Sequence, residues 1–289
     1  MTEDLAARIG ALVGVRLPGV REVGTRHGFR HLTGTLADGR GIFVKAAVGA
    51  GPPGAFAAEA NGLRWLASAG AVPVPAVLGA DERLLVIELL PPGGPTPGAA
   101  RDLGAALARL HAAGAAGFGA PWPGYIASLP LDNTPLGNGA EPDWGSWYAQ
   151  RRLIPYLKRA VDGGALSASA ARPVEAVIGR IGELAGPPEP PSRIHGDLWS
   201  GNVLWPGGRP ALIDPAAHGG HRETDLAMMA LFAPPHLDAI LGAYDEVHPL
   251  ADDWRERVAL HQLHPLLVHA ALFGGSYGAQ AHAAARQYL

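Results

Sequence analysis

The sequence predicts an α+β chain of two lobes, a strand-rich lobe followed by a mostly helical one. Short runs of alternating apolar residues with turn signals fill residues 15–90. A Pro-Pro-Gly-Gly cluster at 91–94 ends this part, and Ala- and Leu-rich segments with helical spacing dominate residues 95–289. We therefore expect an N-lobe at residues 1–90 and a C-lobe at residues 91–289.

The N-lobe is expected to be an antiparallel sheet with a helix. Asp38-Gly39, between two alternating runs, is a strong hairpin signal. Pro73 and Pro75 suit an extended edge segment at 72–77, because proline cannot donate a ladder hydrogen bond. The expected elements are an amphipathic helix at 3–13, strands at 15–24, 30–36 and 41–47, a helix at 55–69 and a strand at 84–90.

Helical periodicity dominates the C-lobe. One β-like stretch at 193–214 interrupts the helices. A segment rich in Pro, Gly and Asn at 120–141 predicts a long surface loop that covers a site. The expected helices are 98–113, 144–160, 167–184, 223–232, 236–244 and 253–273.

The composition argues against several classes of function. The formal net charge is −3 and there is no basic cluster of the kind that nucleic-acid and membrane-surface proteins carry. The absence of cysteine excludes disulfides, thiolate catalysis and cysteine-ligated metal sites. The N-terminus lacks the pattern of a signal peptide and no apolar run is long enough to span a bilayer. We expect a cytoplasmic protein with no nucleic-acid or membrane partner.

The chemistry is concentrated in residues 195–202, His-Gly-Asp-Leu-Trp-Ser-Gly-Asn, and in Asp214, 12 positions further on (214 − 202). Phosphoryl transfer needs a carboxylate that accepts the proton of the acceptor hydroxyl, and an Asn and a second carboxylate that hold magnesium. Asp197 and Asn202 keep the spacing that protein kinases give to the base and the metal-binding Asn. We predict Asp197 as catalytic base and Asn202 and Asp214 as magnesium ligands. The alternative is a turn-rich hairpin whose polar side chains cap loops.

An independent signal lies upstream, in Lys45 and Glu59. A kinase-like site needs a strand lysine that pairs with the α- and β-phosphates of ATP, and a glutamate on the next helix that holds the lysine. Lys45 lies at the end of an apolar strand, and Glu59 lies within the following helix between apolar neighbours. Because both charges have apolar flanks, we predict that they pair. A surface lysine and an unrelated glutamate are the alternative.

Two further segments are expected to contact the nucleotide. The turn at 26–31 contains a single glycine, Gly28. Its backbone amides can meet phosphates, and its basic side chains can assist. An ordinary surface hairpin explains these residues equally well. The adenine is expected beside Glu88 and Leu90, at the end of the last N-lobe strand, where backbone groups would recognise it.

Residues 195–202 resemble the signature of the fructosamine kinase family, and residues 214–227 resemble its Asp-Pro-Ala segment with the trailing Arg-Glu-x-Asp-Leu-Ala. Residues 143–153 and 262–277 are also similar to family segments, so the likeness spans nearly the whole chain. The Asp-Leu-Trp-Ser-Gly-Asn stretch is more specific than the His-Gly-Asp that aminoglycoside and choline kinases share. This sequence departs from the family at the nucleotide loop, which is usually richer in Gly and Ser and often contains a cysteine.

The resemblance implies a protein-kinase-like fold of the aminoglycoside phosphotransferase type. It also implies an enzyme that uses ATP and Mg2+ to phosphorylate a sugar hydroxyl of a ketosamine, such as a fructosamine or ribulosamine. The ketosamine is either a small molecule or a glycated protein lysine. The phosphorylated adduct on a lysine is unstable, which links the family to protein deglycation.

Other polar and aromatic residues have weaker assignments. Trp199 follows the predicted base by two positions, so its ring is a candidate wall of the acceptor site, with core packing as the alternative. His195 is expected to be structural, and Asp225 to fasten the catalytic loop. The residues that follow Asp214 are expected either to lie in a solvated loop or to contact substrate: His218, His221 and Arg222. The histidines of the last long helix are expected to be packed or surface histidines rather than metal ligands: His261, His264 and His269.

Three other functions remain open from the sequence. A kinase acting on an aminoglycoside or choline needs an acidic pocket, for which Asp132, Glu141 and Asp143 are candidates. A nucleotide-binding scaffold without catalysis is opposed by the intact set of polar residues. Protein-kinase activity is disfavoured, because no Ala-Pro-Glu element follows Asp214.

Overall fold

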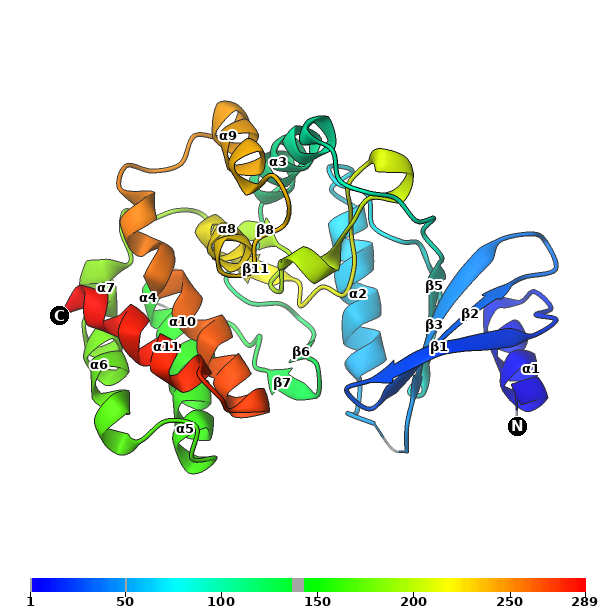
Figure 1. The fold of residues 1–289 in the computed structure, drawn as a ribbon, viewed down its shortest axis with the longest axis horizontal. Helices are drawn as coiled ribbons and strands as arrows, with labels where there is room; N and C mark the ends of the chain where they lie inside the picture. Colours follow the sequence, from blue (N-terminus) through cyan, green and yellow to red (C-terminus); the bar gives the residue numbers. More distant parts are fainter. Residues whose placement is uncertain (1, 50, 137–142) are drawn as a thin grey trace.

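The structure, a computed structural model, describes residues 2–49, 51–136 and 143–289. The sheet with helices α1 and α2 forms an N-lobe at one end, and the remaining helices form a larger C-lobe at the other (Figure 1). The predicted α+β, two-lobed class is therefore confirmed. The division at residue 90 stays a prediction, within a segment that has no helix or strand between β5 and α3.

A five-stranded antiparallel sheet in the order β1-β2-β3-β5-β4 forms the N-lobe. The hairpin predicted at Asp38-Gly39 joins β2 and β3, which pair from Phe29↔Ala47 to Thr35↔Gly41. The strands are β1 Val20–Arg26, β2 Phe29–Thr35, β3 Gly41–Ala47, β4 Val77–Ala80 and β5 Leu84–Glu88.

The alternation of side chains in β3 assigns each face of the sheet to a different helix. Ile42 and Val44 are fully buried in a cluster with Ile9 of α1 (Thr2–Val13). On the opposite face, Phe43 packs with a cluster that includes Phe56 of α2 (Ala55–Ala67). Lys45 has the parity of Phe43, so the strand directs its ammonium towards α2.

Two N-lobe predictions were wrong at the edges of the sheet. The first strand begins at Val20 rather than at 15, because Pro18 and Gly19 precede it. The edge strand lies at Val77–Ala80 rather than at 72–77. Val72 is buried in a C-lobe cluster instead, and Pro73 accepts a hydrogen bond from Leu212, so this stretch runs against the other lobe.

The predicted C-lobe helices are present, with three changes. The stretch expected at 144–160 contains a π-helical turn at Ala149–Leu153 between α4 and α5, and the stretch at 167–184 breaks at Arg180. The helix α11 was missed. The helices are α3 Pro97–Ala112, α4 Trp144–Tyr148, α5 Ile154–Asp162, α6 Ala168–Gly179, α7 Ile181–Leu184, α8 Arg222–Leu231, α9 Leu237–Val247, α10 Trp254–Phe273 and α11 Tyr277–Ala285.

Local chemistry explains where several helices begin. The Thr96 side chain accepts a hydrogen bond from Ala99 N before Pro97, the first residue of α3. Asp143 accepts from the N–H groups of Gly145 and Ser146 at the start of α4. Each such cap stabilises its helix by about 1 kcal/mol.

Short strands complete the C-lobe and surround the predicted catalytic loop. The segment expected as a loop at 120–141 contains the β6–β7 hairpin, which contradicts that expectation, and its residues 137–141 lie outside the described part. β8 pairs with β11, and β9 pairs with β10. The strands are β6 Gly124–Ile126, β7 Leu129–Leu131, β8 Ser192–Ile194, β9 Val203–Leu204, β10 Ala211–Leu212 and β11 His218–Gly220, and 3-10 turns lie at Ser200–Asn202, Pro206–Gly208 and Arg286–Tyr288.

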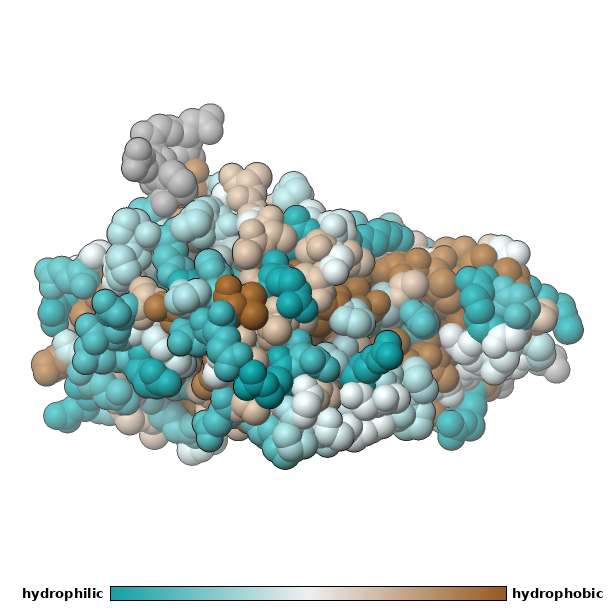
Figure 2. Space-filling model, turned by 90° about the horizontal axis from the view of Figure 1, so that it is seen from above, coloured by the Kyte–Doolittle hydropathy of each residue, from teal (hydrophilic) through white to brown (hydrophobic). Residues whose placement is uncertain are grey.

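The surface differs between the two lobes. Seen from above, the C-lobe end is largely hydrophilic, whereas most of the apolar residues visible on this face gather towards the N-lobe end (Figure 2). Within the described ranges, no helix has both the length and the hydropathy to cross a bilayer.

Candidate active site

A cavity of about 690 Å³ contains almost all of the predicted site residues. Residues from β1, β2, β3, β5 and α2 line it on the N-lobe side, and residues from the β6–β7 hairpin, the 197–204 loop, α10 and α11 line it on the C-lobe side. The predicted residues that line it are Lys45, Glu59, Glu88, Leu90, Asp197, Trp199, Asn202 and Asp214. The two segments singled out by spacing, far apart in the sequence, therefore meet in one place.

Lys45 is held by carboxylates from both lobes. Its Nζ donates to Glu59 Oε1 and Oε2, each at 2.9 Å, and lies 2.8 Å from Asp214 Oδ1. Burial alone would lower the pKa of Lys45, but the carboxylates of Glu59 and Asp214 outweigh burial and raise it. The lysine is therefore a fixed positive charge in the cavity wall, as predicted for its pairing with Glu59.

Asp225 of α8 holds the loop that carries Asp197 by accepting hydrogen bonds from its backbone. Asp225 accepts hydrogen bonds from His195 N at 2.7 Å and from Gly196 N at 2.9 Å, and His111 Nε2 lies 3.2 Å from it. The His195 ring is fully buried; its Nε2 donates to Ile213 O at 2.9 Å, and its Nδ1 accepts from Asp197 N. The expected structural roles of His195 and Asp225 are thereby confirmed, since both orient the loop and neither lines the cavity.

Asp197 and Asn202 are direct neighbours. The amide nitrogen of Asn202 donates to Asp197 O at 2.8 Å and to Asp197 Oδ2 at 3.1 Å. Because both bonds use the nitrogen, the amide oxygen of Asn202 is left for a metal. Burial, reinforced by the negative charge of Asp214, raises the pKa of Asp197 to about 7. A carboxylate with such a pKa is more basic than an exposed one, as proton abstraction requires.

Asp214 reaches the cavity through an unusual backbone conformation. It follows β10 with a φ of 54°, in the left-handed region that Asp and Asn tolerate better than most residues. Ile213 N donates to Asn202 O at 3.0 Å, which ties the two predicted metal-binding segments together. Carboxylate and amide oxygens are the donors that Mg2+ prefers, so Asp214 and Asn202 suit this ion.

Trp199 is exposed at the cavity rather than buried in the core. Its side chain is 38% exposed and lines the cavity. The ring lies over Gly201, where an added Cβ would come within 2.2 Å of the indole. Glycine at 201 therefore leaves the space that the Trp199 ring occupies.

The β1–β2 turn borders the cavity through its basic side chains rather than through its glycine. His27 and Gly28 both have positive φ, 51° and 82°, as a two-residue hairpin turn requires. Arg26 and His27 line the cavity, whereas Gly28 at the tip does not. The His27 ring lies 6.1 Å from Phe273 of α10, so the turn meets the C-lobe across the cavity mouth.

Sequence reasoning missed an aromatic wall on the C-lobe side. Trp122 and Tyr125 come from the region of the β6–β7 hairpin, and Tyr125 donates to Pro53 O at 2.7 Å across the lobes. The residues Phe232, His269, Phe273 and Tyr277 line the other side. The only available signal was the aromatic cluster at the end of the last long helix, which is equally typical of core packing.

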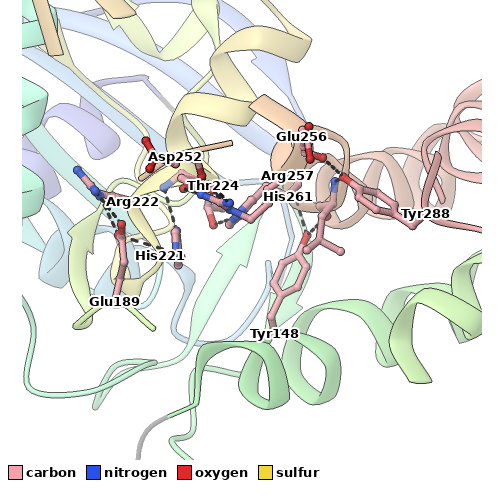
Figure 3. A network of polar contacts seen from close by, with 12 residues as sticks. Tyr148, Glu189, His221, Arg222, Thr224, Asp252, Glu256, Arg257, His261 and Tyr288 are labelled. Atoms are coloured by element: carbon pink, nitrogen blue, oxygen red, sulfur yellow. Dashed lines mark hydrogen bonds and ion pairs between the residues drawn. The ribbon is translucent and has the colours of Figure 1, made fainter. Parts of the chain in front are cut away.

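His221 and Arg222 belong to a buried ionic network (Figure 3). Arg222 pairs with Glu189 through two bonds of 2.7 Å, and Arg257 pairs with Glu223 at 2.7 and 2.9 Å. His218, His221 and Arg222 are all buried and none lines the cavity, so neither substrate contact nor a solvated loop describes them.

One part of this network has the composition of a metal site. The nitrogens of His221 and His261 and a carboxylate oxygen of Glu223 lie within 4.8 Å of one another. However, His221 Nδ1 accepts from Glu223 N at 3.2 Å, so the proton of the neutral ring is on Nε2, the nitrogen that would have to bind the metal. Arg257 already neutralises Glu223. The geometry therefore indicates a charge-balanced scaffold, and the expectation that His261 and His264 are packed is confirmed by their burial.

The whole-chain comparisons decide the family. The sequence profile of the fructosamine kinase family matches residues 22–289. The chain belongs to the fructosamine kinase family. It is 36% identical over 247 residues to an Escherichia coli K12 protein provisionally named a ketoamine kinase, covering 83% of this chain and 82% of that protein. An Enterococcus faecium protein with the same provisional name is 35% identical over 234 residues, covering 78% and 80% of the two chains.

Solved structures agree with this assignment. A Thermobifida fusca protein provisionally named a fructosamine-3-kinase superposes with a TM-score of 0.93 at 50% identity, covering 99% of both chains. A choline/ethanolamine kinase family protein from Mesorhizobium loti, at 18% identity and a TM-score of 0.60 over 99% and 93% of the chains, shows the same fold. This fructosamine kinase family member thus has the predicted protein-kinase-like fold and is an ATP-dependent phosphotransferase.

Proposed function

We propose that this fructosamine kinase transfers the γ-phosphoryl group of ATP to a sugar hydroxyl of a small-molecule ketosamine, a fructosamine or ribulosamine. One observation carries the proposal. Asp197 shares a cavity with the Lys45–Glu59 pair and with Asp214, and that cavity is walled by aromatic side chains on its C-lobe side. Aromatic faces pack well against sugar C–H surfaces, and Asp197 supplies a base beside them.

The proposed roles follow from the contacts. Asp197 orients the acceptor hydroxyl and accepts its proton. Lys45, held by Glu59, pairs with the phosphates of ATP, because its ammonium has a raised pKa and stays charged. Asn202 and Asp214 are the ligands that would hold Mg2+. When bound, this ion would screen the negative charge of the phosphates.

Backbone groups near the lobe junction are assigned to the adenine. The N–H of Glu88 donates to Ala76 O and that of Leu89 donates to Gly41 O, so both are used within the sheet. We assign the next amide, that of Leu90, and the carbonyl of Glu88 to the base. Gly28 remains a proposed phosphate contact through its turn, which borders the cavity at Arg26 and His27.

The acidic pocket expected for a polycationic acceptor receives no support. Asp132 pairs with Arg151 at 3.0 Å, and Asp143 caps α4; neither lines the cavity. The third candidate, Glu141, lies outside the described residues. These positions favour a ketosamine over an aminoglycoside.

Two finer points belong to the same proposal. A glycated protein lysine, rather than a free ketosamine, is the alternative acceptor, and the reaction would then lead to protein deglycation. We also propose that the protein acts in the cytoplasm, where ATP is available.

The test is ADP release with ATP and Mg2+ across a panel of acceptors: fructosyl-lysine, ribulosyl-lysine, a glycated protein, a plain hexose, choline and kanamycin. Asp197→Asn serves as the blank, since it keeps the shape of the side chain and removes the base. We expect turnover on the ketosamines and a loss of about a hundredfold or more in Asp197→Asn, with ATP binding unchanged.

The other outcomes are equally informative. Turnover on kanamycin or choline alone would retain the mechanism and reject the substrate. ATP binding with no turnover on any acceptor would favour a scaffold that does not catalyse. Near-normal turnover in Asp197→Asn would remove Asp197 from the role of base.

A further inference from the structure

His269 of α10 lies between the catalytic loop and the aromatic wall. It lines the large cavity together with Asp197. It also lines a second, small cavity of about 10 Å³, to which Gly196, Asp197 and Asp225 contribute. Because His269 is shared by both cavities, it stands on the acceptor side of the site, beside the proposed base.

The hydrogen bond of His269 determines which of its two ring nitrogens is able to accept another hydrogen bond. Nδ1 lies 2.7 Å from Pro265 O, and a carbonyl oxygen can only accept, so Nδ1 carries the proton. Burial lowers the pKa of His269, which keeps the ring neutral. In a neutral imidazole with its proton on Nδ1, Nε2 is a hydrogen-bond acceptor.

The surroundings of His269 suit a ligand cation that donates a hydrogen bond. Aromatic rings surround the histidine, and the carboxylates of the cavity have other partners or roles. The rings of Phe232, Tyr277 and Phe273 lie 5.0, 5.0 and 5.6 Å from it, and Phe273 is 54% exposed. Aromatic faces attract ammonium groups. Among the described residues, the carboxylates that line the cavity are Glu59, Glu88, Asp197 and Asp214. Two of these pair with Lys45, one is at the adenine side and one is the proposed base.

We propose that His269 determines specificity for the amine of the acceptor: its Nε2 accepts a hydrogen bond from the secondary ammonium of the ketosamine, while the rings of Phe232, Phe273 and Tyr277 surround that charge. The inference rests on the proposed function and deepens it, because it explains how a sugar that carries an amine is distinguished from a plain sugar. In this proposal Asp197 accepts the proton of the sugar hydroxyl, and His269 recognises the ammonium nitrogen of the same ketosamine.

The test compares two acceptors that differ in one atom. N-butyl-fructosamine has the ammonium, and the ether 1-O-butyl-fructose has an oxygen in its place. Wild-type protein is expected to prefer the amine. In His269→Leu, we expect kcat/KM for the amine to fall about 10- to 100-fold, as for loss of a hydrogen bond to a charged group, with the loss mainly in KM. The ether should change less than about twofold, and His269→Gln, which keeps an acceptor, should recover most of the preference.

His282→Leu is a matched control. His282 of α11 also bonds a carbonyl through Nδ1, that of Ala170 at 3.0 Å, and it does not line the cavity. This variant should behave as wild type.

The outcomes separate the two proposals. Equal losses on amine and ether in His269→Leu, or no loss on either, would overturn the role of His269 while the ketosamine activity of the wild type stands. If the wild type turns over neither compound, the proposed function fails, and this inference fails with it. Calorimetric titration of both compounds into Asp197→Asn, with and without His269→Leu, measures binding in the absence of turnover. His269→Leu should remove the preference for the amine over the ether in this measurement as well.

Discussion

Two ionic clusters in the C-lobe and at the cavity differ in their charge balance. In the cavity, the ammonium of Lys45 faces the carboxylates of Glu59, Asp214 and Asp197. In the buried network, two guanidinium groups face two carboxylates, Arg222 with Glu189 and Arg257 with Glu223. The charges of the network balance one another, whereas the cluster around Lys45 holds more negative than positive charge. A site that is to receive a divalent cation needs such an excess, and a scaffold does not.

The pKa values of Asp197 and Glu223 reflect the same difference in charge balance between the cavity and the buried network. The pKa of Asp197 is raised by burial and by Asp214, and the opposing effects of Asn202 and Lys45 do not compensate for them. Burial also acts on Glu223, but the adjacent side chains of His261 and Arg257 overcome it and lower the pKa of Glu223 to about 2. The comparison teaches that a buried carboxylate contributes to stability where an arginine of the same chain pairs with it, as for Glu223. Where no such partner compensates for burial, as for Asp197, its pKa is raised and it suits proton transfer.

The largest expected change in stability tests the charge balance of the buried network. Glu223→Gln removes one charge and leaves the guanidinium of Arg257 buried without an anion, so we expect the free energy of unfolding to fall by about 3 to 5 kcal/mol. Urea denaturation at neutral pH measures this loss.

Glu246→Gln is the control for that experiment. Glu246 pairs with Arg101 at 2.8 Å, but both side chains are more than half exposed, at 61% and 54%. The expected change is within about 0.5 kcal/mol. Equal losses in the two variants would mean that burial does not distinguish the two kinds of ion pair.

A pH series sharpens the same point. The pKa of Glu223 is lowered from 4.5 to about 2 in the folded protein, so its contribution to stability is present above pH 4.5. It is lost as the pH falls from 4.5 towards 2, and amounts to about 3 kcal/mol. The difference in unfolding free energy between wild type and Glu223→Gln should therefore shrink over this interval. A constant difference would show that the charge of Glu223 is not what stabilises the fold.

Removing part of the excess charge in the cavity should affect stability much less than Glu223→Gln does. Asp214→Asn keeps the shape and the backbone preference of the residue but removes one of the surplus charges. We expect kcat/KM to fall by about a hundredfold, with a higher Mg2+ concentration needed for half-maximal rate, and no change in unfolding free energy beyond about 1 kcal/mol. An unchanged Mg2+ titration would argue against Asp214 as a ligand.

Local signals were sufficient for much of the fold and for half of the site. The strand at 41–47 has the predicted bounds because its alternation and the Asp-Gly turn are encoded in adjacent residues. Lys45 and Glu59 were paired from their apolar flanks, and Asp197 and Asn202 from their spacing. In each case the chemistry demands residues at short, fixed separations.

The features that could not be predicted depend on contacts between distant segments. The approach of Asp214 to Lys45 joins residues from different lobes, and no local pattern encodes it. The aromatic wall around His269 has the periodicity of an ordinary packed helix, so nothing in the sequence distinguished a ring that lines a cavity from one that fills a core. Gly28 was chosen as the glycine of the turn, but the basic side chains beside it, which the sequence offered as a second contribution, are what borders the cavity.

The left-handed backbone of Asp214 has a consequence for the genetic variation that this position can accept. With a φ of 54°, the site tolerates Asn, Asp and Gly best, whereas longer side chains are strained there. The role that we propose for Asp214 also needs a negative charge, because the neutral amide of Asn202 is the other proposed ligand, and this requirement excludes Asn and Gly. Aspartate alone meets both demands, so a change to glutamate, which most substitution scales rank among the mildest, would be among the least tolerated at this codon.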